Sequence, residues 1–113
     1  MADEGDLETI AGLLEDETAR RILAKTSSEP MTVNELATHL DASKPTIYRR
    51  VEQLQNHDLV SATIRPTDAG PQEKVFRATF DRLVVSLDDG TYSYDIERTE
   101  RMADRLRRFV DQL

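Results

Sequence analysis

Three cations stand close together in a chain that is otherwise acidic. Residues 42–51 contain three bases and no carboxylate, a local charge of +3, and these bases are Lys44, Arg49 and Arg50. Cations at this density can bind phosphate, and an arginine can also donate two parallel hydrogen bonds to guanine. The neighbouring hydroxyls of Thr46 and Tyr48 can bond to bases, and both side chains can contact thymine methyl groups. The stretch therefore carries side chains suited to DNA.

The residues around these cations predict two short helices joined by a tight turn. Thr32 and Glu35 fit the capping-box pattern that begins a helix. Ser43 is a good N-cap for a second helix, with Pro45 in its first turn, and we expect that helix to end near Asn56. Apolar residues at helical spacing give each helix one buried face: Val33, Leu36, Ala37 and Leu40, then Ile47, Val51 and Leu54. This is the pattern of a helix-turn-helix whose second helix enters the major groove.

The predicted DNA contacts lie on this second helix and on a strand pair that follows it. We expect Lys44, Thr46, Tyr48 and Arg49 to face the bases and Arg50 to face a phosphate. Basic residues in the strand pair can bind phosphate or enter the minor groove. The full predicted set is Ser43, Lys44, Pro45, Thr46, Tyr48, Arg49, Arg50, Arg65 and Lys74. The alternative is a solvated helix face that binds a protein or nothing.

After residue 60 the apolar pattern changes from helix to strand. Residues 60–65 and 74–80 flank a turn cluster at 66–71 and predict the β-hairpin wing of a winged helix. Residues 83–96 contain a hairpin signal, Asp88-Asp89-Gly90, and predict one or two more strands. These strands could respond to a ligand or only widen the sheet. The predicted fold class is α+β, mainly α, in a single domain spanning residues 1–113, with 14–80 as its core.

The two ends of the chain predict helices that could join two subunits. Residues 6–25 show helical spacing as one helix or two, with Asp16 as a plausible second N-cap and Gly12 as a possible break. Residues 97–113 predict a C-terminal helix with a coiled-coil-like seam, which could be internal core or a subunit contact. We expect a homodimer that places two reading helices on a pseudo-palindromic site. The predicted interface residues are Leu7, Ile10, Leu14, Met102, Leu106, Phe109 and Leu113.

Residues 14–23, 32–37, 43–54 and 57–60 together resemble the ArsR-type winged-helix transcription regulators, particularly the small versions of halophilic archaea. The resemblance implies a winged helix-turn-helix that binds double-stranded DNA as a homodimer. This chain has Ala19 where the family usually has arginine. Metal-sensing members use cysteine with clustered histidine or carboxylate ligands. This chain has no cysteine and two distant histidines, His39 and His57, so the metal-sensing role does not carry over, and the effector is open.

The composition excludes several classes of function. The absence of cysteine rules out disulfides and thiolate metal sites. No apolar run is long enough to cross a membrane, and the N-terminus is acidic rather than basic, so we expect a cytoplasmic protein. No nucleophile, phosphate-binding loop or paired-carboxylate pattern stands out, so we expect a non-enzyme without metal or cofactor.

The overall charge supports a second hypothesis, a winged-helix module that binds proteins in a transcription or repair assembly. Twenty-two acids against fifteen bases give a net charge of −7, which opposes binding to phosphate. The excess is local, because residues 1–17 hold seven acids and no base, and residues 18–113 hold fifteen of each. Twelve of the fifteen bases are arginine. Acid excess with few lysines resembles proteins of salt-loving archaea.

If the acid excess is an adaptation to salt, the melting temperature should rise by several degrees from low to multimolar KCl. Salt screens the repulsion among the carboxylates, which is strongest in the folded chain. Thermal melts followed by circular dichroism across a KCl series measure this. An unchanged melting temperature would contradict the interpretation.

Overall fold

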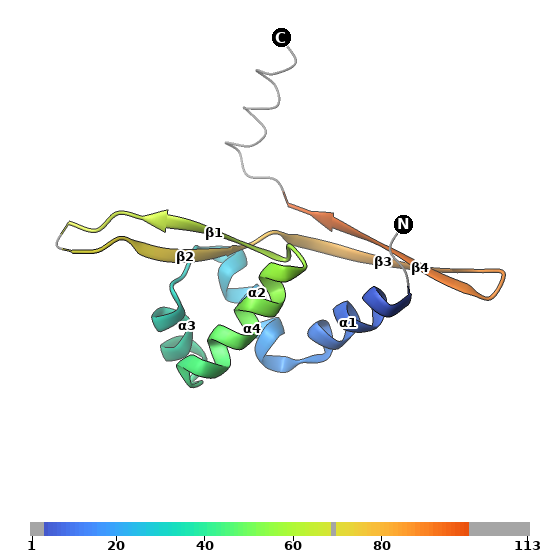
Figure 1. Cartoon of the computed structure of the whole chain (residues 1–113), viewed down its shortest axis with the longest axis horizontal. Coiled ribbons are helices and arrows are strands. Elements are labelled where there is room, and N and C mark those ends of the chain that lie inside the picture. The colour runs from blue at the N-terminus through green and yellow to red at the C-terminus, as the bar shows by residue number, and fades with distance from the viewer. Residues whose placement is uncertain (1–3, 69, 100–113) are drawn as a thin grey trace, which may run out of the picture.

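The computed structural model describes residues 4–68 and 70–99, which form four helices followed by two β-hairpins (Figure 1). Figure 1 shows the hairpins pointing in opposite directions along one side of the helices. The helices are α1 (Glu4–Glu15), α2 (Glu17–Ser28), α3 (Val33–Leu40) and α4 (Lys44–Asn56). The strands are β1 (Val60–Arg65), β2 (Glu73–Ala78), β3 (Phe80–Asp88) and β4 (Thr91–Arg98). This is an α+β winged helix-turn-helix, as predicted.

The N-terminal segment is two helices, and the second begins at the predicted cap Asp16, whereas Gly12 is not a break. Asp16 has extended backbone angles, φ −73° and ψ 122°, and its carboxylate accepts a hydrogen bond from the N–H of Ala19 at 2.8 Å. An aspartate N-cap satisfies a donor that a helix start leaves without a partner, so it favours a new helix at this point. Gly12 stays within α1.

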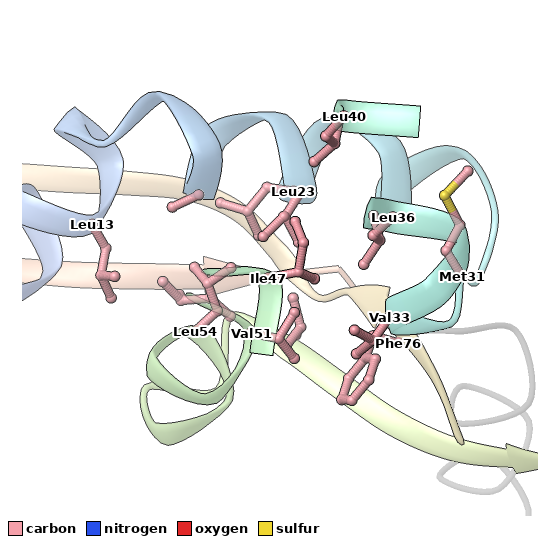
Figure 2. Packing of buried hydrophobic residues seen from close by; sticks show 14 residues of the cluster. Leu13, Leu23, Met31, Val33, Leu36, Leu40, Ile47, Val51, Leu54 and Phe76 are labelled. Carbon is pink, nitrogen blue, oxygen red and sulfur yellow. The ribbon is translucent and has the colours of Figure 1, made fainter. Parts of the chain in front are cut away.

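The hydrophobic core lies where α2, α3 and α4 meet and pack against the first hairpin (Figure 2). Each helix contributes apolar residues spaced three or four apart, which places them on one face. In α4 these are Ile47, Val51 and Leu54, all buried, as predicted. Burial of an aliphatic side chain of this size contributes about 1.5–3 kcal/mol, so the seating of α4 depends mainly on these contacts.

The first hairpin is the predicted wing. β1 and β2 pair antiparallel with Val60 opposite Ala78 and Arg65 opposite Glu73. β1 has the expected bounds, but the second strand ends at Ala78 and Phe80 belongs to β3. On the other edge of β2, Phe76 exchanges backbone hydrogen bonds with Met31, just before α3. The wing is therefore attached to the helix-turn-helix through both of its strands.

The second hairpin forms its own two-stranded sheet, so it does not widen the wing sheet, which is one of the two alternatives that the sequence leaves open for residues 83–96. β3 pairs antiparallel with β4, and the chain reverses at Asp89 and Gly90, with φ 48° and 79°. Two successive positive φ angles are typical of a tight hairpin turn, and the Asp-Gly pair suits it. The hairpin points away from the wing because β3 continues onward from β2 (Figure 1).

The predicted C-terminal helix begins too early, because Glu97 and Arg98 are the last two residues of β4. Glu97 lies opposite Arg82 in the ladder, and this pairing extends the strand past the point where helical spacing first fits. The predicted seam of Met102, Leu106, Phe109 and Leu113 lies outside the described residues.

The predicted subunit contacts on α1 have unequal exposure. Ile10 is 2% exposed and is already buried within its own chain, so it offers almost no area to a second chain. Leu7 and Leu14 are half-buried, and Leu14 packs against the core. The sequence predicted an apolar face on α1 correctly, but much of that face is covered by the rest of the fold.

Replacing Thr32 with alanine should destabilise the protein by about 0.5–2 kcal/mol, because it removes the cap of α3. The hydroxyl of Thr32 accepts a hydrogen bond from the N–H of Glu35 at 3.0 Å, and the Glu35 carboxylate accepts one from the N–H of Thr32 at 3.2 Å. Urea unfolding measures the loss, and Thr32→Ser, which keeps the hydroxyl, is the control. Equal losses for both variants would contradict a capping role.

Candidate nucleic-acid interface

The turn between α3 and α4 has a fixed geometry. Asp41 takes left-handed backbone angles, φ 51° and ψ 47°, and its N–H bonds to the last turn of α3. The N–H of Ala42 donates to the carbonyl of Ala37 at 3.1 Å. Aspartate tolerates the left-handed conformation better than most residues, because its short polar side chain can bond locally. The short turn therefore sets the angle between the two helices.

The reading helix begins at the predicted cap. The hydroxyl of Ser43 accepts a hydrogen bond from the N–H of Thr46 at 3.3 Å and donates one to the Thr46 hydroxyl at 2.9 Å. Pro45 lies in the first turn, where a missing N–H costs nothing. The exposed N-terminal end of α4 carries the positive end of the helix dipole, which favours an anion.

Two of the predicted cations project from α4 without an opposite charge. Lys44 and Arg49 are exposed, and neither has an ion pair or hydrogen bond to another side chain in residues 4–68 and 70–99. Tyr48, between them, is 60% exposed, which is high for a large aromatic side chain. These three residues make up the outer face of the first two turns of α4. Their exposure leaves these side chains available for contacts with bases, and base reading by this face stays a prediction.

Arg50 lies differently from the other two cations. Its Nε donates to Oδ2 of Asp16 at 3.0 Å and its Nη1 donates to Oε1 of Gln53 at 3.1 Å. Its guanidinium therefore joins α4 to the cap of α2 rather than facing outward. The phosphate contact predicted for Arg50 would require the guanidinium to turn away from Asp16.

The ionisation of Asp16 reflects this double role. Partial burial alone would raise the pKa of Asp16, but the N–H of Ala19 and the guanidinium of Arg50 lower it below its usual 3.8. Hydrogen bonds and an adjacent cation both favour the charged carboxylate. Asp16 is therefore ionised at neutral pH while it holds two helices together.

Arg20 and Arg21 also have structural partners. Arg20 donates to the carbonyl of Leu14 at 2.9 Å, at the end of α1, and Arg21 donates to the carbonyl of Leu40 at 3.3 Å, at the end of α3. Cations near the last turn of a helix satisfy carbonyls that have no helical partner and oppose the helix dipole. These two arginines therefore cap helix ends in this structure.

The wing arginine is held by two carboxylates. Nη2 of Arg65 lies 3.0 Å from Oε1 of Glu35 on α3 and 3.0 Å from Oε2 of Glu73 on β2. These hydrogen bonds raise the pKa of Arg65 above its ordinary value. Burial would raise the pKa of Glu35, but its bonds with the backbone of Thr32 and with Arg65 lower it. Arg65 thus fastens the wing to α3, and its charge is largely balanced.

Lys74 is the predicted wing cation that has no carboxylate partner among the described residues. Its Nζ lies 5.6 Å from the centre of the Phe76 ring, a distance at which a cation is attracted to an aromatic face. Lys74 and Phe76 line a groove of about 390 Å³ between the wing and α4. Tyr48 lines the same groove from the helix side. The structure thus brings a residue of the wing and a residue of the reading helix to one hollow.

Three polar residues that line this groove were not expected from the sequence: Asn34, Glu52 and Gln55. Glu52 and Gln55 lie four and seven residues after Tyr48, so they share its helix face. That spacing could have identified them. No comparable signal marks Asn34, which reaches the groove only because α3 packs across α4.

The described residues contain no group of three histidine or carboxylate side chains that could hold a metal ion. His39 and His57 sit near the ends of α3 and α4 and are not neighbours in any such group. Within residues 4–68 and 70–99, every helix is too short or too polar to cross a lipid bilayer.

Residues 14–61 match a family model described as a helix-turn-helix domain. The matched segment covers α2, α3 and α4 and ends within β1. No curated protein matches the chain. The match and the exposed cationic face of α4 together support a DNA-binding regulator with a helix-turn-helix domain.

Replacing Asp16 with asparagine should cost about 0.5–1.5 kcal/mol at neutral pH, because it keeps an N-cap but removes the charge beside Arg50. The pKa of Asp16 is lower in the folded chain, so its charge stabilises the fold above pH 3.8, and this contribution disappears as pH falls further. Urea unfolding of both proteins between pH 7 and pH 3 should show the difference shrinking. The control Glu17→Gln removes a neighbouring exposed charge and should have little effect at any pH. A difference that is constant with pH would contradict the ion pair.

Proposed function

We propose that this protein is a sequence-specific regulator of transcription that binds double-stranded DNA as a homodimer. The observation that carries the proposal is the outer face of α4. Lys44, Tyr48 and Arg49 project from the first two turns of a helix that follows a helix-turn-helix turn. In regulators of this class the N-terminal part of the second helix contacts base edges. These side chains suit guanine and thymine contacts.

In this proposal the wing contacts the sugar-phosphate backbone of the DNA. Lys74 lines the groove that α4 shares with the wing and has no carboxylate partner among the described residues, so it is available to a phosphate of the DNA backbone. Arg65 would contact a phosphate of the DNA only if its guanidinium released Glu35 or Glu73. Since these pairs are exposed, their exchange for a phosphate would cost little. Cations that contact phosphate position the protein on DNA and carry no sequence preference themselves.

A homodimer would place two copies of α4 about one DNA turn apart, ~34–36 Å, on a pseudo-palindromic site. The two-fold symmetry of such a dimer is then mirrored in the DNA sequence. In this proposal the protein acts by binding DNA. It catalyses no reaction and uses neither a metal nor a cofactor. The residues that resemble the ArsR-type regulators, within 14–60, and the excess of acidic residues support an ArsR-type regulator of the small, salt-adapted kind.

A second candidate function is a protein-binding winged-helix module. The observation that favours it is the engagement of the cations. Arg50 and Arg65 are bound to carboxylates, and Arg20 and Arg21 are bound to carbonyls at helix ends. Fewer cations are therefore available to DNA than the number of basic residues in the sequence suggests. Lys44 and Arg49 favour DNA more strongly because nothing in the described chain balances their charge.

Replacing Arg49 with alanine should weaken binding to a specific DNA site by about 1–3 kcal/mol and relax base preference at one position. A gel shift on DNA selected from a random-sequence library measures this. The control Lys25→Ala removes an exposed cation in the last turn of α2, and it should leave the affinity nearly unchanged.

The same assay at moderate and at multimolar salt separates the two candidate functions. Phosphate contacts release counterions, so the affinity of most DNA-binding proteins falls as salt rises. For a chain of net charge −7 the slope should be shallow, because salt also screens the repulsion between carboxylates and DNA. Absence of binding at both salt concentrations would favour the protein-binding module.

A further inference from the structure

The second hairpin has an apolar face that the fold covers only in part. Because side chains alternate along strands, six residues share this face: Leu83, Val85 and Leu87 of β3, and Tyr92, Tyr94 and Ile96 of β4. At the base, Tyr94 is 9% exposed and Ile96 packs against the core. Toward the tip, Val85, Leu87 and Tyr92 are 47%, 61% and 45% exposed. An apolar face that continues from the core into solvent calls for a partner.

The outer edge of β3 offers backbone groups to such a partner. Among the described residues, β3 pairs along its length only with β4. Asp88 and Thr91 close the tight turn and bond to one another across it, so alternation directs the amides of Leu83, Val85 and Leu87 away from β4. This stretch has no proline, glycine or charged residue of the kind that protects edge strands.

We propose that β3 pairs antiparallel with β3 of a second copy of this chain, with Val85 at the two-fold axis. The two hairpins then form a four-stranded sheet. An isolated two-stranded hairpin is marginally stable in water, whereas a wider sheet with one apolar face is stable. This inference identifies the contact that joins the homodimer of the proposed function and depends on that homodimer.

The side chains of β3 are complementary to themselves in this register. Pairing about Val85 places Arg82 opposite Asp88 of the other copy, twice, and Leu83 opposite Leu87, twice. Opposite charges and apolar side chains that face each other across strands stabilise a sheet. Moving the axis by one residue, to Val84 or Ser86, would place Arg82 opposite Ser86 or Gly90 and lose both charge pairs.

The present partners of Arg82 allow this rearrangement. Its Nε lies 3.3 Å from Asp81 and 2.9 Å from Glu97, and the Arg82 side chain is exposed. Exposed ion pairs contribute little, so Arg82 can bind Asp88 of a second copy at small cost. Strand β4 is less accessible than β3, because α1 packs against it. The edge of β3 is therefore the better surface for a second copy.

In this register the exposed tip also gains apolar neighbours across the seam between the two β3 strands. Antiparallel pairing brings the tip of each hairpin beside the base of the other, where α1 packs on β4. The apolar faces of the two hairpins then join into one. The contact is isologous, because the same strand serves on both sides, so the assembly closes at two copies.

Charge exchange in trans tests the register. Arg82→Asp and Asp88→Arg should each weaken self-association on the order of tenfold, because each places two pairs of like charges across the axis. Mixing the two variants should restore dimers, since every pair in the mixed dimer again joins an acid to a base. Sedimentation velocity with one variant fluorescently labelled measures both effects. Circular dichroism identifies any variant that fails to fold.

A cysteine crosslink tests the axis independently, in a chain that has no cysteine of its own. In Val85→Cys the two sulfurs meet at the axis, where hydrogen-bonded residues have Cα atoms about 5.5 Å apart, within the range for a disulfide. Mild oxidation should yield mostly covalent dimer. The control Ser86→Cys should stay monomeric on denaturing gels, because its two copies are offset by two residues and lie more than about 7 Å apart.

Three results would overturn the inference. They are a wild-type chain that is monomeric, charge variants that associate as the wild type does, and crosslinking that is no better at position 85 than at position 86. A monomer would leave this apolar face to another partner. DNA binding by gel shift is a separate readout. If the mixed variants dimerise and no DNA binds, the contact stands and the proposed function fails. If DNA binds but the crosslink at position 85 does not form, the proposed function stands and the contact between the two β3 strands fails.

Discussion

The structure depends on the carboxylate of Asp16, which bonds to two helices at once. It caps α2 through the N–H of Ala19 and holds α4 through the guanidinium of Arg50. The apolar residues of α4 fix its depth in the core, but burial is non-directional. A charge-assisted hydrogen bond is directional, so it reinforces the rotation of α4 about its own axis that the buried face of the helix favours. The direction in which Lys44, Tyr48 and Arg49 project follows from that rotation.

A second carboxylate has the same kind of double role at the wing. Glu35 completes the capping box of α3 and also binds Arg65 of β1, which links the wing to the helix-turn-helix. In this chain these two acids thus link separate elements rather than only adding to a diffuse negative surface. They pair with part of the positive charge. Three cations without a carboxylate partner among the described residues lie at the start of α4 and beside the groove: Lys44, Arg49 and Lys74. An acidic protein can therefore present a small cationic face.

Much of the fold could be predicted from the sequence because its signals are local. The caps Thr32 and Ser43, the strand bounds of β1 and the Asp-Gly turn each depend on residues within four positions of one another. Prediction failed where a distant partner decided. Glu97 and Arg98 extend β4 because they pair across the ladder. Ile10 lies on the apolar face of α1 that was predicted to contact a second subunit, yet the rest of its own chain buries it.

The sequence by itself determined which residues could read DNA, since a capped helix start with Lys44, Thr46, Tyr48 and Arg49 follows from local chemistry. Only the tertiary structure decided which cations remain available. Arg50 and Arg65 are of the same residue type as Arg49, but their partners Asp16 and Glu35 lie 34 and 30 residues away in the chain. A local sequence pattern cannot reveal pairs of residues that are this far apart along the chain. A guanidinium pairs with whichever carboxylate the packing of helices and strands brings within about 3 Å.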